Sequence, residues 1–236
     1  MILHTNVLGE GDPLVLIHSG GMTGSTEYEE QSVYFSKREF KVIRPDLRGH
    51  GKSPGELNNY FSRCIEDIRE TMEHLNVDKI NIAGVSIGGI VALLFAQAYP
   101  HKVKSLCFSG IFPYKPDKWN EMLREEGEHY EQLFNDAVTV SILNEIHGDT
   151  DWKTSLRSFN NDNFYPFDKT GDVADLKVPT LCMMGEQQEL EVSSTVKYKQ
   201  LNSNINISII PFAGHLVHRD QPELYTQTLH TFIKNV

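Results

Sequence analysis

The chain has 236 residues, the size of one large domain or of one domain that carries an insertion. Its composition, 39% hydrophobic and 23% charged, is typical of globular proteins that fold without a disulfide or metal. The formal net charge of -10 disfavours nucleic acid as a partner, because such binding depends on neutralising phosphates. Three cysteines, an odd number, argue against a disulfide framework. Neither a membrane span nor a secretory signal is visible, so we expect a cytoplasmic protein.

Short apolar runs alternate with helical patterns, which is typical of a parallel β-sheet covered by helices. Residues 2–8 are expected to form an edge strand, because a turn sequence, GEGDP, follows them. Six further runs are expected to be strands: residues 14–18, 41–44, 79–83, 105–109, 180–184 and 206–210. Helical periodicity predicts three helices, of which the second is apolar nearly all round and therefore buried against the sheet: residues 61–75, 87–99 and 222–233.

Residues 111–175 interrupt this alternation. They hold 10 of the 23 aromatic residues, with 14 acidic and 6 basic side chains, a net charge of -8. We interpret them as a helical cap inserted into a core made of residues 1–110 and 176–236. Most of the aromatic side chains are expected to hold the insertion together and the others to line a pocket, while the acidic side chains face water.

The strongest functional signal is the sequence GVSIGG at residues 84–89, which directly follows an expected strand and begins the apolar helix. A serine in such a G-x-S-x-G turn is held in a strained conformation above the sheet, and the glycines allow close backbone approach. The helix N-terminus directs free N–H groups toward the place where an oxyanion would form. Ser86 is therefore the candidate nucleophile, against the alternative of a glycine-rich turn with an incidental serine.

A serine nucleophile needs a base, and the base needs a carboxylate that orients it. His215 is the candidate base, because the sequence AGH follows the last expected strand and open α/β sheets place their sites at that edge. His218 would serve only if the loop were arranged differently. The remaining histidines are expected to be ordinary surface or core residues: His4, His18, His50, His74, His101, His129, His147 and His230.

Four segments in this order resemble the α/β-hydrolase superfamily, and more narrowly its small carboxylesterase and lactonase-like members with a helical cap. They are VLIHSGG at residues 15–21, RPDLRGHGKS at 44–53, the serine turn at 84–89 and AGH at 213–215. The resemblance covers roughly residues 10–110 and 178–236. It implies an α/β-hydrolase fold with an eight-stranded, mostly parallel sheet flanked by helices, and a cap inserted after strand six, which fits the insertion.

By position, the resemblance implies that Ser86 is the nucleophile, that His215 is the base, and that the N–H of Ile87 donates to the oxyanion. The second oxyanion donor would be the N–H of Gly20. Ser19 stands where the family usually has a glycine, and its side chain could narrow the loop or add a hydroxyl to the site. No cofactor is implied, since the patterns for phosphate loops, dinucleotides and zinc are incomplete or missing.

The sequence departs from the family at the triad acid, which the family places as an Asp in a Gly-x-x-Asp turn after strand seven. Here the turn reads MGEQQELE, and Gln188 occupies the position of the Asp. A neutral amide can orient an imidazole but cannot stabilise the imidazolium. We take Glu189 as the acid, because one inserted residue would bring it into place, and assign Glu191 to the start of the next helix. The alternatives left open are Glu186, an acid from elsewhere such as Asp117 in the cap, or no acid at all.

The sequence thus predicts a serine esterase that cleaves a carboxylic ester or lactone of a small to medium apolar substrate through an acyl-enzyme. The acidity of the cap argues against a strongly anionic substrate. Two alternatives stay open on the same fold: C–C bond hydrolysis or cofactor-free peroxidation, and a non-catalytic protein that binds a small signal molecule. The expected partner is a small-molecule ester, and the sequence carries no indication of an oligomeric state.

Overall fold

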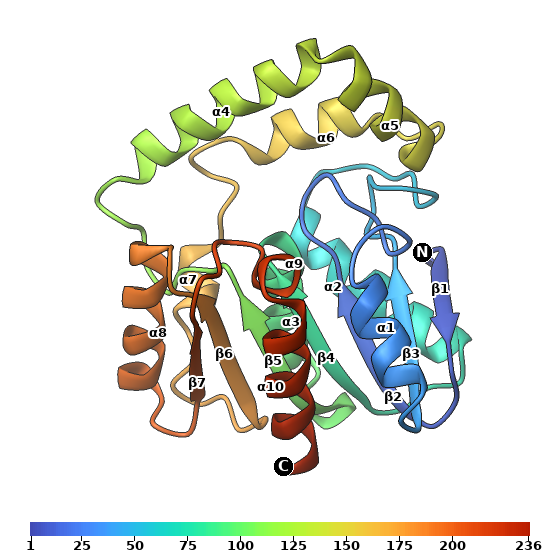
Figure 1. Ribbon diagram of the computed structural model, residues 1–236, viewed down its shortest axis with the longest axis vertical. Helices are drawn as coiled ribbons and strands as arrows, with labels where there is room; N and C mark the ends of the chain where they lie inside the picture. Colours follow the sequence, from blue (N-terminus) through green and yellow to red (C-terminus); the bar gives the residue numbers. More distant parts are fainter.

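The computed structural model describes all residues, 1–236, as a central β-sheet between two layers of helices, with further helices across one end of the sheet (Figure 1). The seven strands follow the order β1-β3-β2-β4-β5-β6-β7, and β1 alone runs antiparallel to its neighbour. Their bounds are β1 Thr5–Leu8, β2 Asp12–Ile17, β3 Phe40–Pro45, β4 Ile80–Val85, β5 Val103–Ser109, β6 Thr180–Gly185 and β7 Asn206–Ile210.

The sheet has one strand fewer than the eight that the family resemblance implied. Each of the seven apolar runs in the sequence forms a strand, and the eighth strand rested on the resemblance alone. β1 pairs with β3 along its whole length and ends the sheet on that side. The segment between β5 and β6 accordingly follows the fifth strand rather than the sixth.

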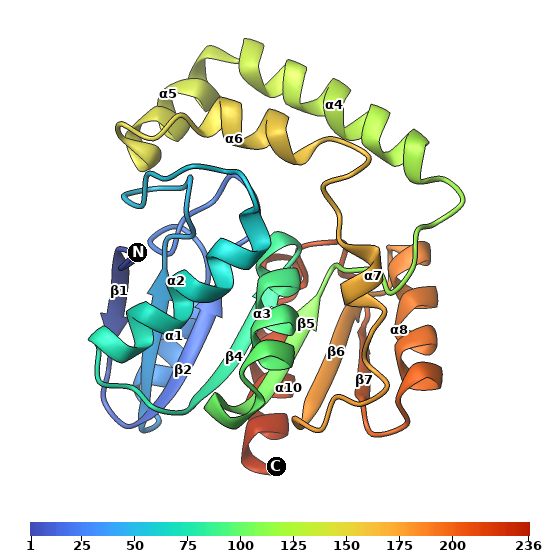
Figure 2. The same ribbon diagram turned by 180° about the vertical axis from the view of Figure 1, so that it is seen from behind.

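Helices cover both faces of the sheet. α1 and α10 lie on one face and α2, α3 and α8 on the other (Figures 1 and 2). The three predicted helices are confirmed within one residue at each end, as α2, α3 and α10. None of the helices is long and apolar enough to cross a membrane. The bounds are α1 Glu29–Ser36, α2 Tyr60–His74, α3 Ile87–Ala98, α8 Glu189–Leu201, α9 Val217–Asp220 and α10 Pro222–Lys234, with a 3-10 turn at Pro100–Lys102.

The two helical layers explain why the strands are continuous apolar runs rather than alternating ones. Along β2, Val15 and Ile17 enter the core beneath α2 and α3. Leu14 and Leu16, which point the other way, enter the core beneath α1 and α10. Because both faces of a parallel sheet are covered, both sets of side chains must be apolar.

Between β5 and β6 the chain forms three helices that lie across the end of the sheet, and a short fourth helix that returns to it (Figures 1 and 2). We call the first three helices the cap. Two of them begin with an aspartate that accepts a hydrogen bond from the N–H three residues on, Asp136 from Thr139 and Asp151 from Thr154. The four helices are α4 Trp119–Asn135, α5 Ala137–His147, α6 Trp152–Phe159 and α7 Phe167–Thr170.

The cap docks on the loop that contains the RPDLRGHGKS sequence. His147, the last residue of α5, accepts the N–H of Gly51 at Nδ1 and donates from Nε2 to the carbonyl of Gly21, each at 3.0 Å. The hydroxyl of Ser155 on α6 donates to the carbonyl of Gly49 at 2.9 Å. Residues 44–53, which carry the RPDLRGHGKS sequence, therefore help to hold the cap over the sheet.

Candidate active site

Ser86 lies between β4 and α3 in a strained backbone conformation. Its φ of 55° and ψ of -124° fall in a region that residues other than glycine rarely adopt, and its N–H donates to the carbonyl of Ser109 at 2.9 Å. A Cβ on Gly84 would lie 2.2 Å from the carbonyl oxygen of Gly88, and a Cβ on Gly88 would lie 2.4 Å from that of Ile17. Steric contact thus requires both glycines of the G-x-S-x-G turn.

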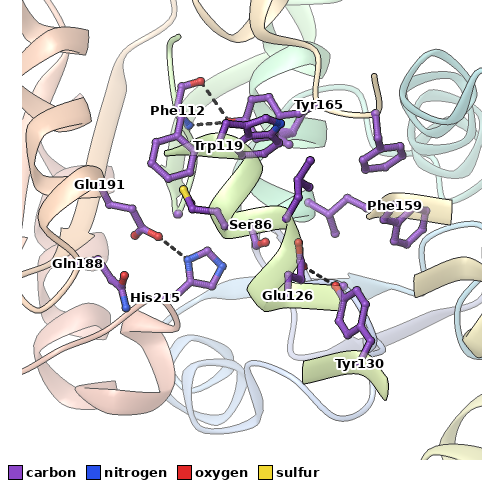
Figure 3. A pocket seen from close by; sticks show the side chains of 17 residues that line it. Ser86, Phe112, Trp119, Glu126, Tyr130, Phe159, Tyr165, Gln188, Glu191 and His215 are labelled. Atoms are coloured by element: carbon purple, nitrogen blue, oxygen red, sulfur yellow. Dashed lines mark hydrogen bonds and ion pairs between the residues drawn. The ribbon is translucent and has the colours of Figure 1, made fainter. Parts of the chain in front are cut away.

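Ser86 lines a cavity of about 300 Å³ between the sheet and the cap (Figure 3). Of the other predicted site residues, Gly20, Ile87 and His215 line the same cavity and Glu189 does not. Six of the ten aromatic residues of the insertion also line it, a larger share than the sequence analysis expected. These six are Phe112, Trp119, Tyr130, Phe159, Phe164 and Tyr165.

His215 is held by Glu191, with 2.5 Å between Nδ1 and Oε1. Figure 3 shows the other ring nitrogen on the side that faces Ser86. Burial lowers the pKa of His215, but the hydrogen bond and charge of Glu191 raise it, and the pKa stands above its ordinary value. Ser86 and His215 form no hydrogen bond in this structure, and contacts of this kind often form only when substrate is bound.

The prediction that Glu189 orients His215 is wrong, and helix geometry explains why. α8 begins at Glu189, so Glu189 and Glu191 are two positions apart and point about 200° from each other around the helix axis. Glu191 is 4% exposed and faces His215, whereas Glu189 is exposed. Because the two side chains point to opposite sides of α8, only Glu191 reaches His215.

The other acids that the sequence left open do not contact His215. The carboxylate of Glu186 accepts the N–H of Phe212 at 3.1 Å. Gln188, at the position of the family's Asp, is the N-cap residue of α8 and lines the cavity without a hydrogen bond. Asp117 is exposed and does not line the cavity.

The two predicted oxyanion donors have free N–H groups. Ile87 is the first residue of α3, so its N–H has no acceptor within the helix. The N–H of Gly20 donates to no other residue. Ser19 donates from both its N–H, at 2.5 Å, and its hydroxyl, at 3.1 Å, to the carboxylate of Glu27. The hydroxyl of Ser19 is thus bound to Glu27, and Ser19 does not line the cavity.

Glu27 is a buried carboxylate that the sequence analysis missed. Its Oε1 lies 3.0 Å from Arg219 and 3.2 Å from Nε2 of His218, both on α9, the helix that follows His215. Burial raises the pKa of Glu27, but His218, Arg219 and the N–H of Ser19 lower it, to about 2. The ionised carboxylate therefore joins the oxyanion loop to the loop that carries the candidate base. His218, held in this contact, does not line the cavity.

Gly110, directly after β5, is a second residue that sequence reasoning missed. Its φ is +67°, and a Cβ there would lie 2.6 Å from Cε1 and 3.0 Å from Nδ1 of His215. Any side chain at this position would displace the imidazole from its place beside Glu191.

The structure holds neither a metal-binding cluster nor a reactive thiol. No group of three His, Cys, Asp or Glu side chains is placed to hold a metal ion. Cys64, Cys107 and Cys182 are all buried and unpaired. Burial raises the pKa of each thiol, which keeps all three protonated.

The fold and the serine turn together define an α/β hydrolase. The chain belongs to the alpha/beta hydrolase fold family, whose sequence model matches residues 12–229. It is similar to the putative 2-succinyl-6-hydroxy-2,4-cyclohexadiene-1-carboxylate synthase of Bacillus subtilis (strain 168), with 25% identity over 256 residues, covering 95% of this chain and 91% of that protein.

Two further relatives are an enol-lactonase and an esterase. The 3-oxoadipate enol-lactonase 1 of Acinetobacter baylyi is 22% identical over 227 residues, which cover 85% of this chain and 81% of that protein. Among solved structures, a marine microorganism esterase matches with a TM-score of 0.77 and 25% identity, covering 98% of this chain and 99% of that chain. These comparisons place the chain in the alpha/beta hydrolase fold family, with an enol-lactonase and an esterase among the proteins that it resembles.

Proposed function

We propose that this protein is a serine hydrolase that cleaves a carboxylic ester or lactone of a small to medium apolar substrate. The observation that carries the proposal is the convergence of Ser86, His215 and two free N–H groups on one largely apolar cavity. Glu191, in contact with His215, supplies the carboxylate that such a pair requires.

In the first half of the reaction, His215 Nε2 takes the proton of the Ser86 hydroxyl while Oγ attacks the carbonyl carbon of the substrate. The N–H groups of Gly20 and Ile87 stabilise the negative charge that develops on the carbonyl oxygen. The bond to the leaving oxygen then breaks, and His215 gives its proton to that oxygen. The alcohol departs and the acyl group stays on Ser86.

In the second half, His215 takes a proton from a water molecule that attacks the acyl-enzyme. The ester bond to Ser86 breaks, and the proton returns from His215 to Oγ. The carboxylic acid is released with the enzyme in its starting state. Glu191 holds the imidazole in the required tautomer and stabilises its charged form at each step.

We also propose the division of labour expected from the sequence. Residues 111–175 would act as a cap unit that shapes the substrate pocket, and residues 1–110 and 176–236 would form the core that carries the reacting groups. The aromatic side chains of residues 111–175 support this division, because they make up six of the ten hydrophobic residues that line the cavity.

The non-catalytic alternative drew its weight from Gln188, which stands where the family has its acid. The contact between Glu191 and His215 removes that argument, because the histidine has a buried carboxylate partner from another position. A catalytic role is therefore the one that we favour over binding alone.

Two experiments test the proposal. A fluorophosphonate probe, which reacts with activated serines, should label wild-type protein stoichiometrically at Ser86 and should leave the Ser86→Ala variant unlabelled. A series of p-nitrophenyl esters from acetate to octanoate should be hydrolysed by wild type, with activity lower by at least about 10³-fold in Ser86→Ala and His215→Ala.

The outcomes separate the alternatives. Folded protein that is neither labelled nor active on any ester would contradict the proposed function. Turnover of a dienone ring-cleavage product with no turnover of short esters would instead favour C–C bond hydrolysis.

A further inference from the structure

Helix α4 turns one stripe of side chains toward the cavity. Its five cavity-lining residues follow the i, i+3, i+4, i+7, i+11 pattern of one helix face: Trp119, Met122, Leu123, Glu126 and Tyr130. Four of them are apolar or aromatic, and Glu126 is the exception. The helix carries its other acids elsewhere on its surface, so this one acid occupies a position where the pattern calls for an apolar side chain.

The charge of Glu126 has no cationic partner. Its single hydrogen bond comes from the hydroxyl of Tyr130, 2.5 Å from Oε1, and Oε2 has none. No Lys or Arg lines the cavity, and the imidazole of His215 is engaged by Glu191. The two arginines of the cap form ion pairs with other acids, Arg124 with Glu128 and Arg157 with Glu131.

Aromatic rings form much of the lining of the cavity that Glu126 also lines. Figure 3 shows Glu126 hydrogen-bonded to Tyr130, on the other side of Ser86 from the pair of His215 and Glu191. Aromatic faces attract ammonium groups through their quadrupole, and a carboxylate adds direct charge attraction. Glu126 is exposed to solvent where it lines the cavity, and its unpaired carboxylate in an aromatic-lined cavity is suited to an ammonium group and repels a carboxylate.

We propose that Glu126 determines substrate specificity and that the preferred substrate carries a positively charged ammonium group, on either the acyl or the alcohol side of the ester. The inference rests on the proposed ester hydrolysis and refines its substrate from a wholly apolar ester to one that is apolar apart from an ammonium group. The ammonium lies beside Oε2 of Glu126 and against the aromatic wall while Ser86 attacks the carbonyl carbon. Substrates with a carboxylate in that position are excluded by repulsion.

The test compares esters that differ only in charge. On the acyl side, p-nitrophenyl 4-(trimethylammonio)butyrate is matched by the neutral p-nitrophenyl 5,5-dimethylhexanoate and by the anionic mono-p-nitrophenyl glutarate. On the alcohol side, butyrylthiocholine is matched by S-(3,3-dimethylbutyl) butanethioate. Values of kcat/KM are measured at one pH for wild type, Glu126→Gln and Glu125→Gln. The first variant removes the charge but keeps an acceptor for Tyr130, and the second removes an exposed charge on α4 that does not line the cavity.

In wild type, the cationic member of at least one pair should exceed its neutral partner by roughly 5- to 30-fold in kcat/KM. Glu126→Gln should abolish most of that ratio, and Glu125→Gln should keep it. If the ratio of cationic to neutral kcat/KM is the same in wild type and in Glu126→Gln for both pairs, the inference is overturned. Hydrolysis of the neutral esters would still support the proposed function in that case. Equal losses in both variants would assign the preference to the overall charge of the cap and also overturn the inference.

If no ester is hydrolysed at all, that result counts against the proposed function alone. A binding measurement then still tests the inference. Calorimetry compares choline with its neutral isostere 3,3-dimethylbutan-1-ol as ligands of wild-type protein and of Glu126→Gln. Tighter binding of choline to wild type, lost in the variant, supports the ammonium site. Equal binding of the two ligands, or binding of neither, contradicts it.

Discussion

At the scale of single residues, charge and backbone conformation are set by a few close contacts. Glu191 lies in the first turn of α8, where the N-terminal end of the helix favours a negative charge, and only one of its oxygens has a hydrogen-bond partner. Ser86 keeps its strained φ and ψ because Gly84 and Gly88 leave room for the turn. The reactivity of the site therefore depends on these contacts, and a conservative substitution at Glu191 tests one of them.

Replacing Glu191 by Gln should lower kcat by about 10²- to 10⁴-fold, because an amide cannot stabilise the imidazolium. In wild type, kcat/KM should rise with pH through the pKa of His215, which lies above 6.5, since the base must be neutral. The variant lacks the partner that raises this pKa, so its acid limb should move to lower pH.

The control for this measurement is Glu189→Gln, which removes an exposed carboxylate two residues away. It should leave both kcat and the pH profile unchanged. If Glu189→Gln shifted the profile and Glu191→Gln did not, the assignment of the acid from the structure would be wrong.

At the scale of secondary-structure elements, the cap and the core are joined by polar contacts to backbone groups. His147 joins three separate segments, because its ring contacts the loop after β2 and the loop after β3 from the end of α5. One of these contacts is to Gly21, next to the candidate oxyanion donor Gly20. Docking of the cap is thereby coupled to the geometry of the oxyanion loop.

His147→Ala should loosen the cap. It removes two buried hydrogen bonds, which are together worth about 1–3 kcal/mol. Amide hydrogen exchange in α4, α5 and α6 should accelerate by roughly 5- to 100-fold, with little change in the central strands. His129→Ala on α4, which removes an exposed imidazole, is the matched control and should leave exchange unchanged. An unaltered exchange rate in the cap of His147→Ala would show that other contacts hold it in place.

At the scale of the whole molecule, three neighbouring buried histidines make the fold sensitive to acid. The ring centroids of His18 and His50 are 4.9 Å apart, and those of His50 and His147 are 5.9 Å apart. Burial lowers the pKa of each of the three. His18 and His147 each accept a backbone N–H, so protonation would break a hydrogen bond as well as place charge in the core.

The free energy of unfolding should therefore fall as pH is lowered below 6.5. In that range the unfolded chain binds protons that the buried histidines of the folded protein do not, which favours unfolding. His215, whose pKa is raised, acts in the opposite direction, and its contribution is lost as pH rises above 6.5. Glu27 adds a further loss between about pH 4.5 and 2. Urea unfolding at pH 8, 7, 6 and 5 measures the effect, and a stability that stayed constant or rose from pH 6.5 to 5 would contradict it.

Much of the architecture follows from local patterns. The apolar runs predicted every strand, and helical periodicity predicted α2, α3 and α10. A helix was expected to begin at Glu191, two residues after the observed start of α8, but its length was not predicted. The side chains that it buries are mostly polar, although they lie at helical spacing: Glu191, Ser194, Thr195 and Tyr198. α1 was missed because it likewise buries polar side chains, Gln31 and Ser32, beside Phe35.

The sequence by itself determined the seven strands and the helices α2, α3 and α10 along the chain, the glycine turn around Ser86, and the positions of His215 and Gly20 at the edge of the sheet. These features depend on residue types only a few positions apart, through steric limits on the backbone and the period of each element. Only the tertiary structure decided which carboxylate meets His215, why Gly110 must lack a side chain, and that Glu126 faces the cavity. Those outcomes depend on the rotation of a helix about its axis and on contacts between segments distant in the chain, which no local pattern records.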